Sequence, residues 1–302
     1  FLCLVHDSAL THRPFPGGSP ALSEPAAPRR ELPTDPATLE PMGEAFDAAL
    51  DAGLTELDLL DARAASPIAR RTYEAHARLL RDWNKAINLT AIRDPEGIAV
   101  RHVCDSLSAV PHLEPLVKPG TSLLDIGSGG GYPGLPLAAA LPLGGVSLLD
   151  SVGKKSRFLE VAGDAVSAIL AEAEDDPEEA TQIEAIGERA ETIAEIDEVR
   201  EAWDLVVSRA VGSLAEVLEL SLPLTKIGGM VAVWKREEER GGLREELQGA
   251  GSIIRAAGAG RPRVLPIEAA SLSDHRLVLV AKERPTPVAY PRPAGVRRRK
   301  QR

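Results

Sequence analysis

Seven short apolar runs, separated by stretches of helical periodicity, constrain the fold of this chain more than any other feature. The runs cover residues 122–126, 146–149, 183–186, 205–207, 230–234, 264–267 and 277–281. Continuous apolar runs of this length are typical of strands buried on both faces, and such strands alternating with helices indicate a mostly parallel, doubly wound sheet. The last two runs are joined by a short serine-rich segment, which predicts an antiparallel pair at one edge.

The chain before the first run divides into two segments. Residues 1–38 contain seven prolines and no hydrophobic period, so we expect a disordered arm. Residues 39–118 show helical periodicity, with Ser66 as the N-cap of one helix and Asp94 at the start of another. We therefore predict an N-terminal helical segment over residues 39–118, followed by the sheet domain over residues 119–283.

Composition bounds the class of protein. Hydrophobic residues make up 44% of the 302 residues, which is enough for a sizeable core, although aromatic residues contribute only 3%. The two cysteines, Cys3 and Cys104, and the six histidines form no disulfide framework or metal-ligand pattern. No run is long enough to span a membrane. We expect a cytoplasmic protein with no metal and no membrane contact.

The net charge of −10 is concentrated in one segment. Residues 172–201 contain 13 acidic residues against Arg189 and Arg200, and this segment includes an insertion-like run at about 172–182. The tail over residues 284–302, which we expect to be irregular, contains seven basic residues and no acidic residue. This separation predicts a basic face that can meet nucleic acid and an acidic face turned away from it.

A glycine-rich loop follows the first apolar run. It reads D-I-G-S-G-G-G-Y-P-G from Asp125 to Gly134 and opens a helix. Nucleotide-like ligands bind at such a loop because glycines let the backbone approach them closely. Asp150, at the end of the next run, can hold ribose hydroxyls of either NAD or S-adenosylmethionine. A carboxylate at Asp125 suits a cationic sulfonium better than a pyrophosphate, so we favour the methyl donor, with NAD and a purely structural turn as alternatives.

Further blocks surround this loop. They are, in order, W-N-K and N-L-T within 83–90, R-H-V-C-D-S at 101–106, L-D-S and G-K-K within 149–155, S-R-A at 208–210 and Y-P-R at 290–292. Taken together with the loop, they closely resemble the RsmG (GidB) family, class I methyltransferases that modify the N7 of a guanine in small-subunit ribosomal RNA. The resemblance covers roughly residues 70–300.

The resemblance implies an α/β fold with the Rossmann-like sheet of class I S-adenosylmethionine-dependent methyltransferases, mostly parallel with an antiparallel edge and preceded by the N-terminal helical segment. It implies 16S ribosomal RNA as the partner, free or within the assembled small subunit. Asp125, Gly129 and Asp150 are donor-binding candidates from the loop pattern, and the resemblance adds Gly127, Tyr132, Ala190, Glu191 and Arg209. For Arg209, an RNA phosphate and Asp125 are alternative partners.

Methyl transfer to N7 uses an existing lone pair, so we expect no catalytic triad and a protein that works by positioning. The catalytic candidates are Asn88, His102 and Arg209. The RNA-binding candidates are Asn88, Arg101, Lys235, Arg297, Arg298 and Arg299. Structural alternatives are a helix C-cap for Asn88, a buried hydrogen bond to Asp105 for His102 and a solvated side chain for Lys235.

A monomeric rRNA (guanine-N7)-methyltransferase is the interpretation that we favour. The alternatives are a class I methyltransferase with another substrate, an NAD-dependent oxidoreductase and a non-catalytic RNA-binding protein.

Overall fold

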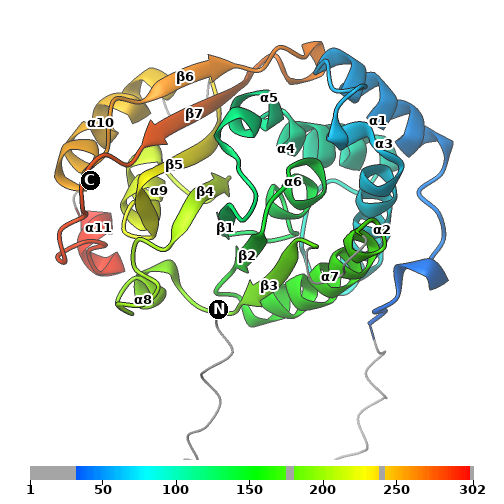
Figure 1. Ribbon diagram of the computed structural model, residues 1–302, viewed down its shortest axis with the longest axis horizontal. Helices are drawn as coiled ribbons and strands as arrows, with labels where there is room; N and C mark the ends of the chain where they lie inside the picture. The colour runs from blue at the N-terminus through cyan, green and yellow to red at the C-terminus, as the bar shows by residue number, and fades with distance from the viewer. Residues whose placement is uncertain (1–31, 175–179, 238–241, 300–302) are drawn as a thin grey trace, which may run out of the picture. The chain divides into compact units, whose positions relative to one another are not determined.

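All seven predicted strands belong to one sheet, in the order β3-β2-β1-β4-β5-β7-β6 (Figure 1). The strands are β1 (Ser122–Ile126), β2 (Gly145–Leu149), β3 (Gln182–Ile186), β4 (Trp203–Arg209), β5 (Thr225–Arg236), β6 (Arg263–Pro266) and β7 (His275–Ala281). The first five are parallel, whereas β7 is antiparallel to both β5 and β6. The predicted α/β fold with an antiparallel edge is confirmed. The computed structural model describes residues 32–174, 180–237 and 242–299, without the side chains of 298 and 299.

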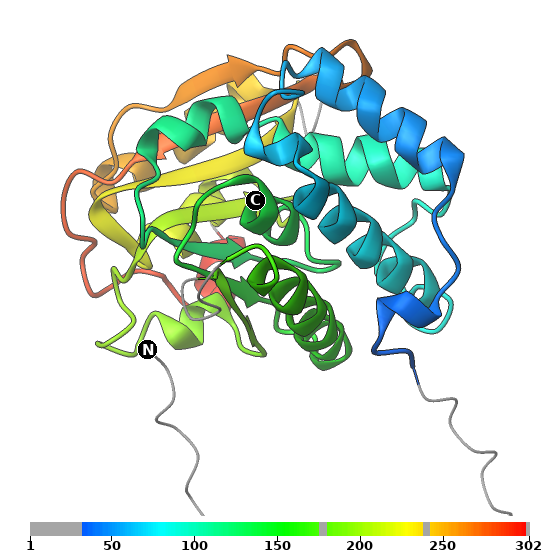
Figure 2. The ribbon, with the colours of Figure 1, turned by 45° about the vertical axis from the view of Figure 1, so that its right-hand side comes forward.

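Helices cover both faces of the sheet (Figure 2). The helices are α1 (Glu44–Glu56), α2 (Pro67–Trp83), α3 (Pro95–Ile98), α4 (Asp105–Leu107), α5 (Val110–Leu113), α6 (Gly134–Ala140), α7 (Gly153–Ala171), α8 (Ala190–Ile193), α9 (Leu214–Ser221), α10 (Leu243–Ala256) and α11 (Ala294–Arg299). Successive strand residues point to opposite faces. Leu123 therefore packs in one core with α1, α2, α6 and α7, and Leu124 in the other with α8, α9 and α10.

The N-terminal helices belong to the first of these cores. Ser66 caps α2, as predicted, because its hydroxyl accepts a hydrogen bond from Ala69 N at 3.2 Å. At the other end of α2, the ring of Trp83 meets that of Phe158 on α7 edge-on, with centroids 5.4 Å apart. The helical segment and the sheet are therefore parts of one compact unit.

The expected boundaries of the arm and tail need correction. Residues 32–38 pack against the core, with a 3-10 turn at Pro36–Thr38 and a 2.7 Å hydrogen bond from Trp83 Nε1 to Pro33 O. The expected disordered arm therefore does not reach residue 38, and the rest of it lies outside the described residues. The tail is not irregular throughout, since Ala294–Arg299 is helical. Residues 175–179 of the acidic insertion lie outside the described residues.

Across the described ranges, no helix combines the length and the apolar character needed to cross a membrane.

Asp125 closes the turn from β1 into α6. Its side chain is fully buried, and its Oδ2 accepts a hydrogen bond from Gly134 N at 2.9 Å. Its Oδ1 has no hydrogen-bond partner among the described residues. Burial raises the pKa of Asp125 to about 7, despite the hydrogen bonds that favour the charged form.

We expect Phe158→Ala to lower the free energy of unfolding by about 3–5 kcal/mol, because it leaves a cavity between α2 and α7. Urea unfolding should remain a single transition by tryptophan fluorescence and circular dichroism. Arg157→Ala, which removes an exposed neighbour paired with Glu160, is the control and should cost less than about 1 kcal/mol. Separate unfolding of the helices and the sheet would contradict the shared core.

The raised pKa of Asp125 makes stability depend on pH. The carboxyl group of Asp125 has a pKa of 3.8 in the unfolded chain and of about 7 in the folded protein. The folded state therefore binds more protons in this window, and its stability falls as the pH rises through it. We expect Asp125→Asn to gain stability relative to the wild type between pH 5 and pH 8, measured by urea unfolding without ligand. The exposed Asp164→Asn controls for the loss of one carboxylate, and an equal difference at both pH values would contradict the burial argument.

Candidate active site

A pocket of about 350 Å³ opens at the carboxyl ends of the parallel strands. Four of the predicted donor-binding residues line it, namely Gly127, Asp150, Ala190 and Glu191. They come from the loop after β1, the end of β2 and the start of α8. The fold therefore brings predicted residues that are up to 64 positions apart in the sequence into one cavity.

Gly127 and Asp150 are held by backbone hydrogen bonds. Gly127 has a φ of +74° and donates from its N to Leu149 O at 2.8 Å. A Cβ at this position would lie 2.4 Å from Val211 Cγ2, so no other residue fits without a shift. The carboxylate of Asp150 accepts from Gly129 N at 3.1 Å and from Val152 N at 2.9 Å. These bonds fix an acidic group on the wall of the pocket.

Four predicted donor contacts do not line this pocket, namely Asp125, Gly129, Tyr132 and Arg209. Asp125 lies beneath the loop, on the face that carries α6. Tyr132 is 4% exposed and lies between two histidine rings, with centroids 4.3 Å from His76 and 4.7 Å from His102. The side chain of Tyr132 does not reach this pocket, because its ring packs between the loop and the N-terminal helices, and a donor contact through its backbone stays a prediction.

Glu191 has a partner that the sequence analysis assigned to RNA. Its Oε1 accepts a hydrogen bond from Arg297 NH2, and Arg297 is itself buried and lines the same pocket. Burial alone would raise the pKa of Glu191, but the hydrogen bond and charge of Arg297 outweigh it and lower the pKa. The expectation that Arg297 faces RNA is corrected, because its guanidinium is used inside the protein. The structure does not describe the side chains of Arg298 and Arg299.

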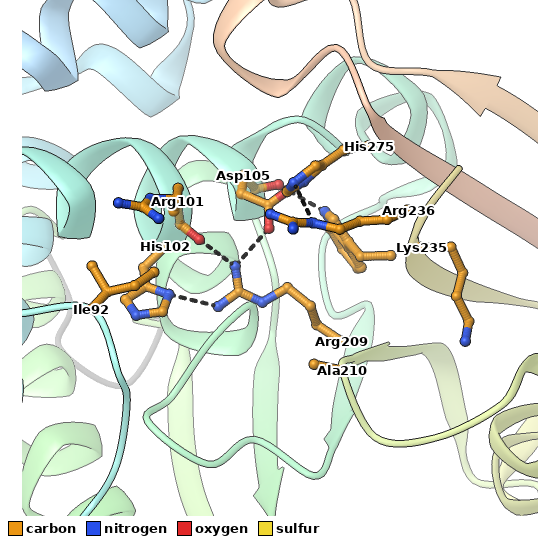
Figure 3. Close-up of a pocket in the computed structure, with 10 residues that line it drawn as sticks. Ile92, Arg101, His102, Asp105, Arg209, Ala210, Lys235, Arg236 and His275 are labelled. Atoms are coloured by element: carbon orange, nitrogen blue, oxygen red, sulfur yellow. Dashed lines mark hydrogen bonds and ion pairs between the residues drawn. The ribbon is translucent and has the colours of Figure 1, made fainter. Parts of the chain in front are cut away.

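A second pocket, of about 280 Å³, lies on the other side of Ala210, which lines both cavities (Figure 3). Its lining residues are Ile92, Arg101, His102, Asp105, Arg209, Ala210, Trp234, Lys235, Arg236 and His275. Ala210 has a φ of +60°, which is uncommon for a residue with a Cβ. This backbone turn directs Arg209 towards the second pocket while Val211 lines the first.

Arg209 is the centre of a hydrogen-bond network in the second pocket. Its NH1 donates to Asp105 Oδ2 at 2.8 Å and to Arg101 O at 3.0 Å. The other oxygen of Asp105 accepts a hydrogen bond from His275 Nδ1 at 2.7 Å. Arg236 Nε donates to His275 Nε2, so the ring proton of His275 lies on Nδ1. Burial would raise the pKa of Asp105, but the hydrogen bonds from His275 and Arg209 and the charge of Arg209 hold the pKa below its ordinary value.

His102 is neutral, with its proton on Nε2. Arg209 NH2 can only donate, so Nδ1 of His102 must accept across their 3.2 Å contact. Its Nε2 then donates to Thr90 Oγ1 at 2.8 Å. Burial, followed by the charge of Arg209, lowers the pKa of His102 to about 3. The alternative of a bond between His102 and Asp105 is wrong, since Arg209 and His275 occupy the Asp105 carboxylate.

Two further predictions about partners change. Arg209 pairs with Asp105 and not with Asp125. Lys235 is buried and not solvated, because its Nζ lies 2.7 Å from Glu246 Oε2 and donates to Gly212 O at 2.7 Å.

Asn88 is exposed and lines neither pocket, and the C-cap position of α2 is occupied by Asn84. Asn84 accepts from Leu89 N and Thr90 N and donates to Thr90 O.

Three residues of the site were not predicted from the sequence. His275 and Arg236 lie on neighbouring antiparallel strands, β7 and β5, where they are paired in register. Lys155 lines the larger pocket, with its Nζ 4.0 Å from Asp150. The G-K-K block carried a signal for Lys155, whereas the register that brings His275 to Asp105 could not be read from apolar runs.

Comparisons with known proteins agree with this geometry. The family model GidB, described as rRNA small subunit methyltransferase G, matches residues 70–250. A ribosomal RNA small subunit methyltransferase G from Symbiobacterium thermophilum is 35% identical over 83% of this chain and 96% of its own. Proteins with the same description from Roseiflexus sp. and Bacillus velezensis are 38% and 33% identical, over 78% and 74% of this chain and 91% and 86% of their own. The chain therefore belongs to the GidB family of rRNA small subunit methyltransferase G.

Proposed function

We propose that this protein transfers a methyl group from S-adenosylmethionine to the N7 of a guanine in 16S ribosomal RNA. Family membership supports both the methyl donor and the small-subunit RNA. The observation that carries the reaction is the contact of two pockets at Ala210, one with the features of a donor site and the other lined by arginines. The donor methyl group and the target base can therefore meet at the carboxyl end of β4.

The larger pocket fits the donor. Its volume of about 350 Å³ falls in the usual range for small-molecule sites, roughly 300–1,000 Å³. Bound S-adenosylmethionine supplies an electrophilic methyl group on a sulfonium. Gly127 allows close approach of the backbone, Asp150 offers its carboxylate to ribose hydroxyls and Glu191 stands at the start of α8 to receive a donor group.

The smaller pocket receives the target base. Guanine N7 attacks with an in-plane lone pair, so no residue has to remove a proton, and the protein acts by orienting the reactants. Arg209 and Asp105 form a pair without net charge, which tolerates the positive charge that develops on the purine. Both nitrogens of His102 are committed to Thr90 and Arg209, so we assign His102 to positioning Arg209 and not to acid–base catalysis.

The rim of the smaller pocket is suited to the RNA backbone. Arg101 is exposed there, and Arg236 has a half-exposed side chain. A guanine that enters the pocket must be turned out of its stack, and cationic side chains at the rim can hold the flanking phosphates. Asn88 lies on the exposed loop that Asn84 closes, and we retain it as an RNA-binding candidate. We also retain Arg298 and Arg299 of the tail as RNA-binding candidates.

We further propose that the protein acts as a monomer in the cytoplasm, on free 16S RNA or on the assembled small subunit. The decisive experiment incubates the protein and labelled S-adenosylmethionine with naked 16S RNA and with small subunits, both from a strain that lacks this modification. Mapping of the methylated nucleotide should identify N7 of one guanine. Transfer to another position, or to no RNA, would overturn the assignment, and the two substrates distinguish free RNA from the subunit.

Gly127→Ala should weaken donor binding at least tenfold, because the new Cβ would collide with Val211 and the positive φ disfavours it. Calorimetry with S-adenosylmethionine measures the affinity. Gly120→Ala is a matched control, since Gly120 has a φ of +84° but open space around it and lies away from both pockets. Unchanged affinity in Gly127→Ala would show that the donor binds elsewhere.

Arg101→Ala should raise the KM for RNA severalfold and leave donor affinity unchanged. If Arg101 neutralises one phosphate, the slope of log affinity against log salt should fall by about 0.7–0.9. Arg244→Ala on α10, at an exposed position that lines neither pocket, is the control. An identical salt slope in wild type and Arg101→Ala would remove Arg101 from the RNA interface.

A further inference from the structure

The C-terminal helix α11 forms part of the wall of the larger pocket. Ala294 and Arg297 of α11 line it together with Glu191 of α8 and Leu220 of α9. Figure 1 shows α11, in red, beside α8 and α9. Residues near the end of the chain are thus brought to a cavity whose other walls follow strands β1 to β4.

The segment that leads to α11 is fixed to the rest of the fold. Arg292 donates from its N, Nε and NH2 to the buried carboxylate of Glu219 on α9, at 2.9, 2.7 and 2.6 Å. Arg200 NH2 donates to the carbonyls of Thr286, Pro287 and Tyr290. These contacts hold the approach to α11 in one place, so its position over the pocket is built into the structure.

Arg297 is buried with one hydrogen-bond donor unused. Its side chain is 5% exposed, its NH1 donates to Arg292 O at 2.8 Å and its NH2 donates to Glu191. Its buried Nε has no partner in the described part of the chain. Burying a guanidinium is costly unless its donors are satisfied, so the hydrogen bonds to Arg292 O and to Glu191 hold Arg297 at this position in the pocket wall.

The charges around the pocket support the same interpretation. Its described lining includes four carboxylates, Asp150, Glu188, Glu191 and Glu216, against the three cations Lys155, Arg189 and Arg297. Without Arg297 the carboxylate of Glu191 would lose the partner that orients it and lowers its pKa.

We infer that Arg297 is a positioning residue of the donor pocket, which holds the Glu191 carboxylate in place for the bound ligand. This inference rests on the proposed function, since it takes the larger pocket as the donor site. It assigns the last described helix to donor binding, whereas the basic composition of the tail pointed to RNA alone.

The test measures the affinity for S-adenosylhomocysteine, the demethylated form of the donor, by calorimetry on the full chain. This ligand lacks the sulfonium charge, so its affinity depends less on the net charge of the pocket than the affinity for S-adenosylmethionine does. We expect Arg297→Ala to weaken binding about tenfold, as befits the loss of a charge-assisted hydrogen bond. Arg284→Ala, an exposed residue of the same segment, is the control and should bind like the wild type. Arg297→Lys should recover part of the affinity and covers the case in which Arg297→Ala does not fold.

A double-mutant cycle distinguishes positioning from a general structural role. If Arg297 acts through Glu191, Glu191→Gln combined with Arg297→Ala should weaken binding less than the product of the two single effects. Affinity for 16S RNA should stay within twofold of the wild type in Arg297→Ala.

Two results would overturn the inference: wild-type affinity for S-adenosylhomocysteine in both Arg297 variants, or weakened RNA binding with unchanged ligand binding. If the wild type itself binds neither S-adenosylmethionine nor S-adenosylhomocysteine, the proposed function fails and not merely the role of Arg297.

Discussion

The buried ion pair between Arg209 and Asp105 joins the two parts of the molecule that form the site. Arg209 ends β4 of the sheet, whereas Asp105 follows the π-helical turn Ala99–Cys104 in the N-terminal helical segment. Removing both charges from water is costly, and the pair persists because neighbouring groups complete its hydrogen bonds. His275 donates to Asp105, and Arg101 O and His102 accept from Arg209. The smaller pocket exists only where the helices and the sheet meet in this way.

Much of the fold was predictable from the sequence because strand burial leaves a local signature. Each apolar run became a strand, and the glycine loop with Asp150 predicted two walls of the larger pocket. The helical segment was also predictable, since the N-cap at Ser66 is a local interaction. These features depend on a few neighbouring residues, and their physical causes do not require knowledge of tertiary contacts.

The identities of side-chain partners could not be predicted in the same way. Lys235, Tyr132 and Arg297 were each assigned from their position in the chain, yet their partners Glu246, His76 and Glu191 come from other elements. Basic composition indicates attraction to phosphate, but it does not distinguish an exposed cation from one that is neutralised inside the fold. For Arg297, the pairing depends on how the chain after β7 returns across α9, which no local pattern encodes.

The order of strands has a consequence for the newly synthesised chain. β7 is the last strand in sequence, but it lies between β5 and β6 and carries His275 to Asp105. Until β7 has emerged from the ribosome and paired with β5, the Asp105 carboxylate lacks one of its two side-chain donors, and the smaller pocket lacks one wall. Synthesis proceeds from the N-terminus, so the glycine loop is present long before this pocket can close. The incomplete chain therefore cannot form the whole site, and the part assigned to the target base is among the last to be assembled.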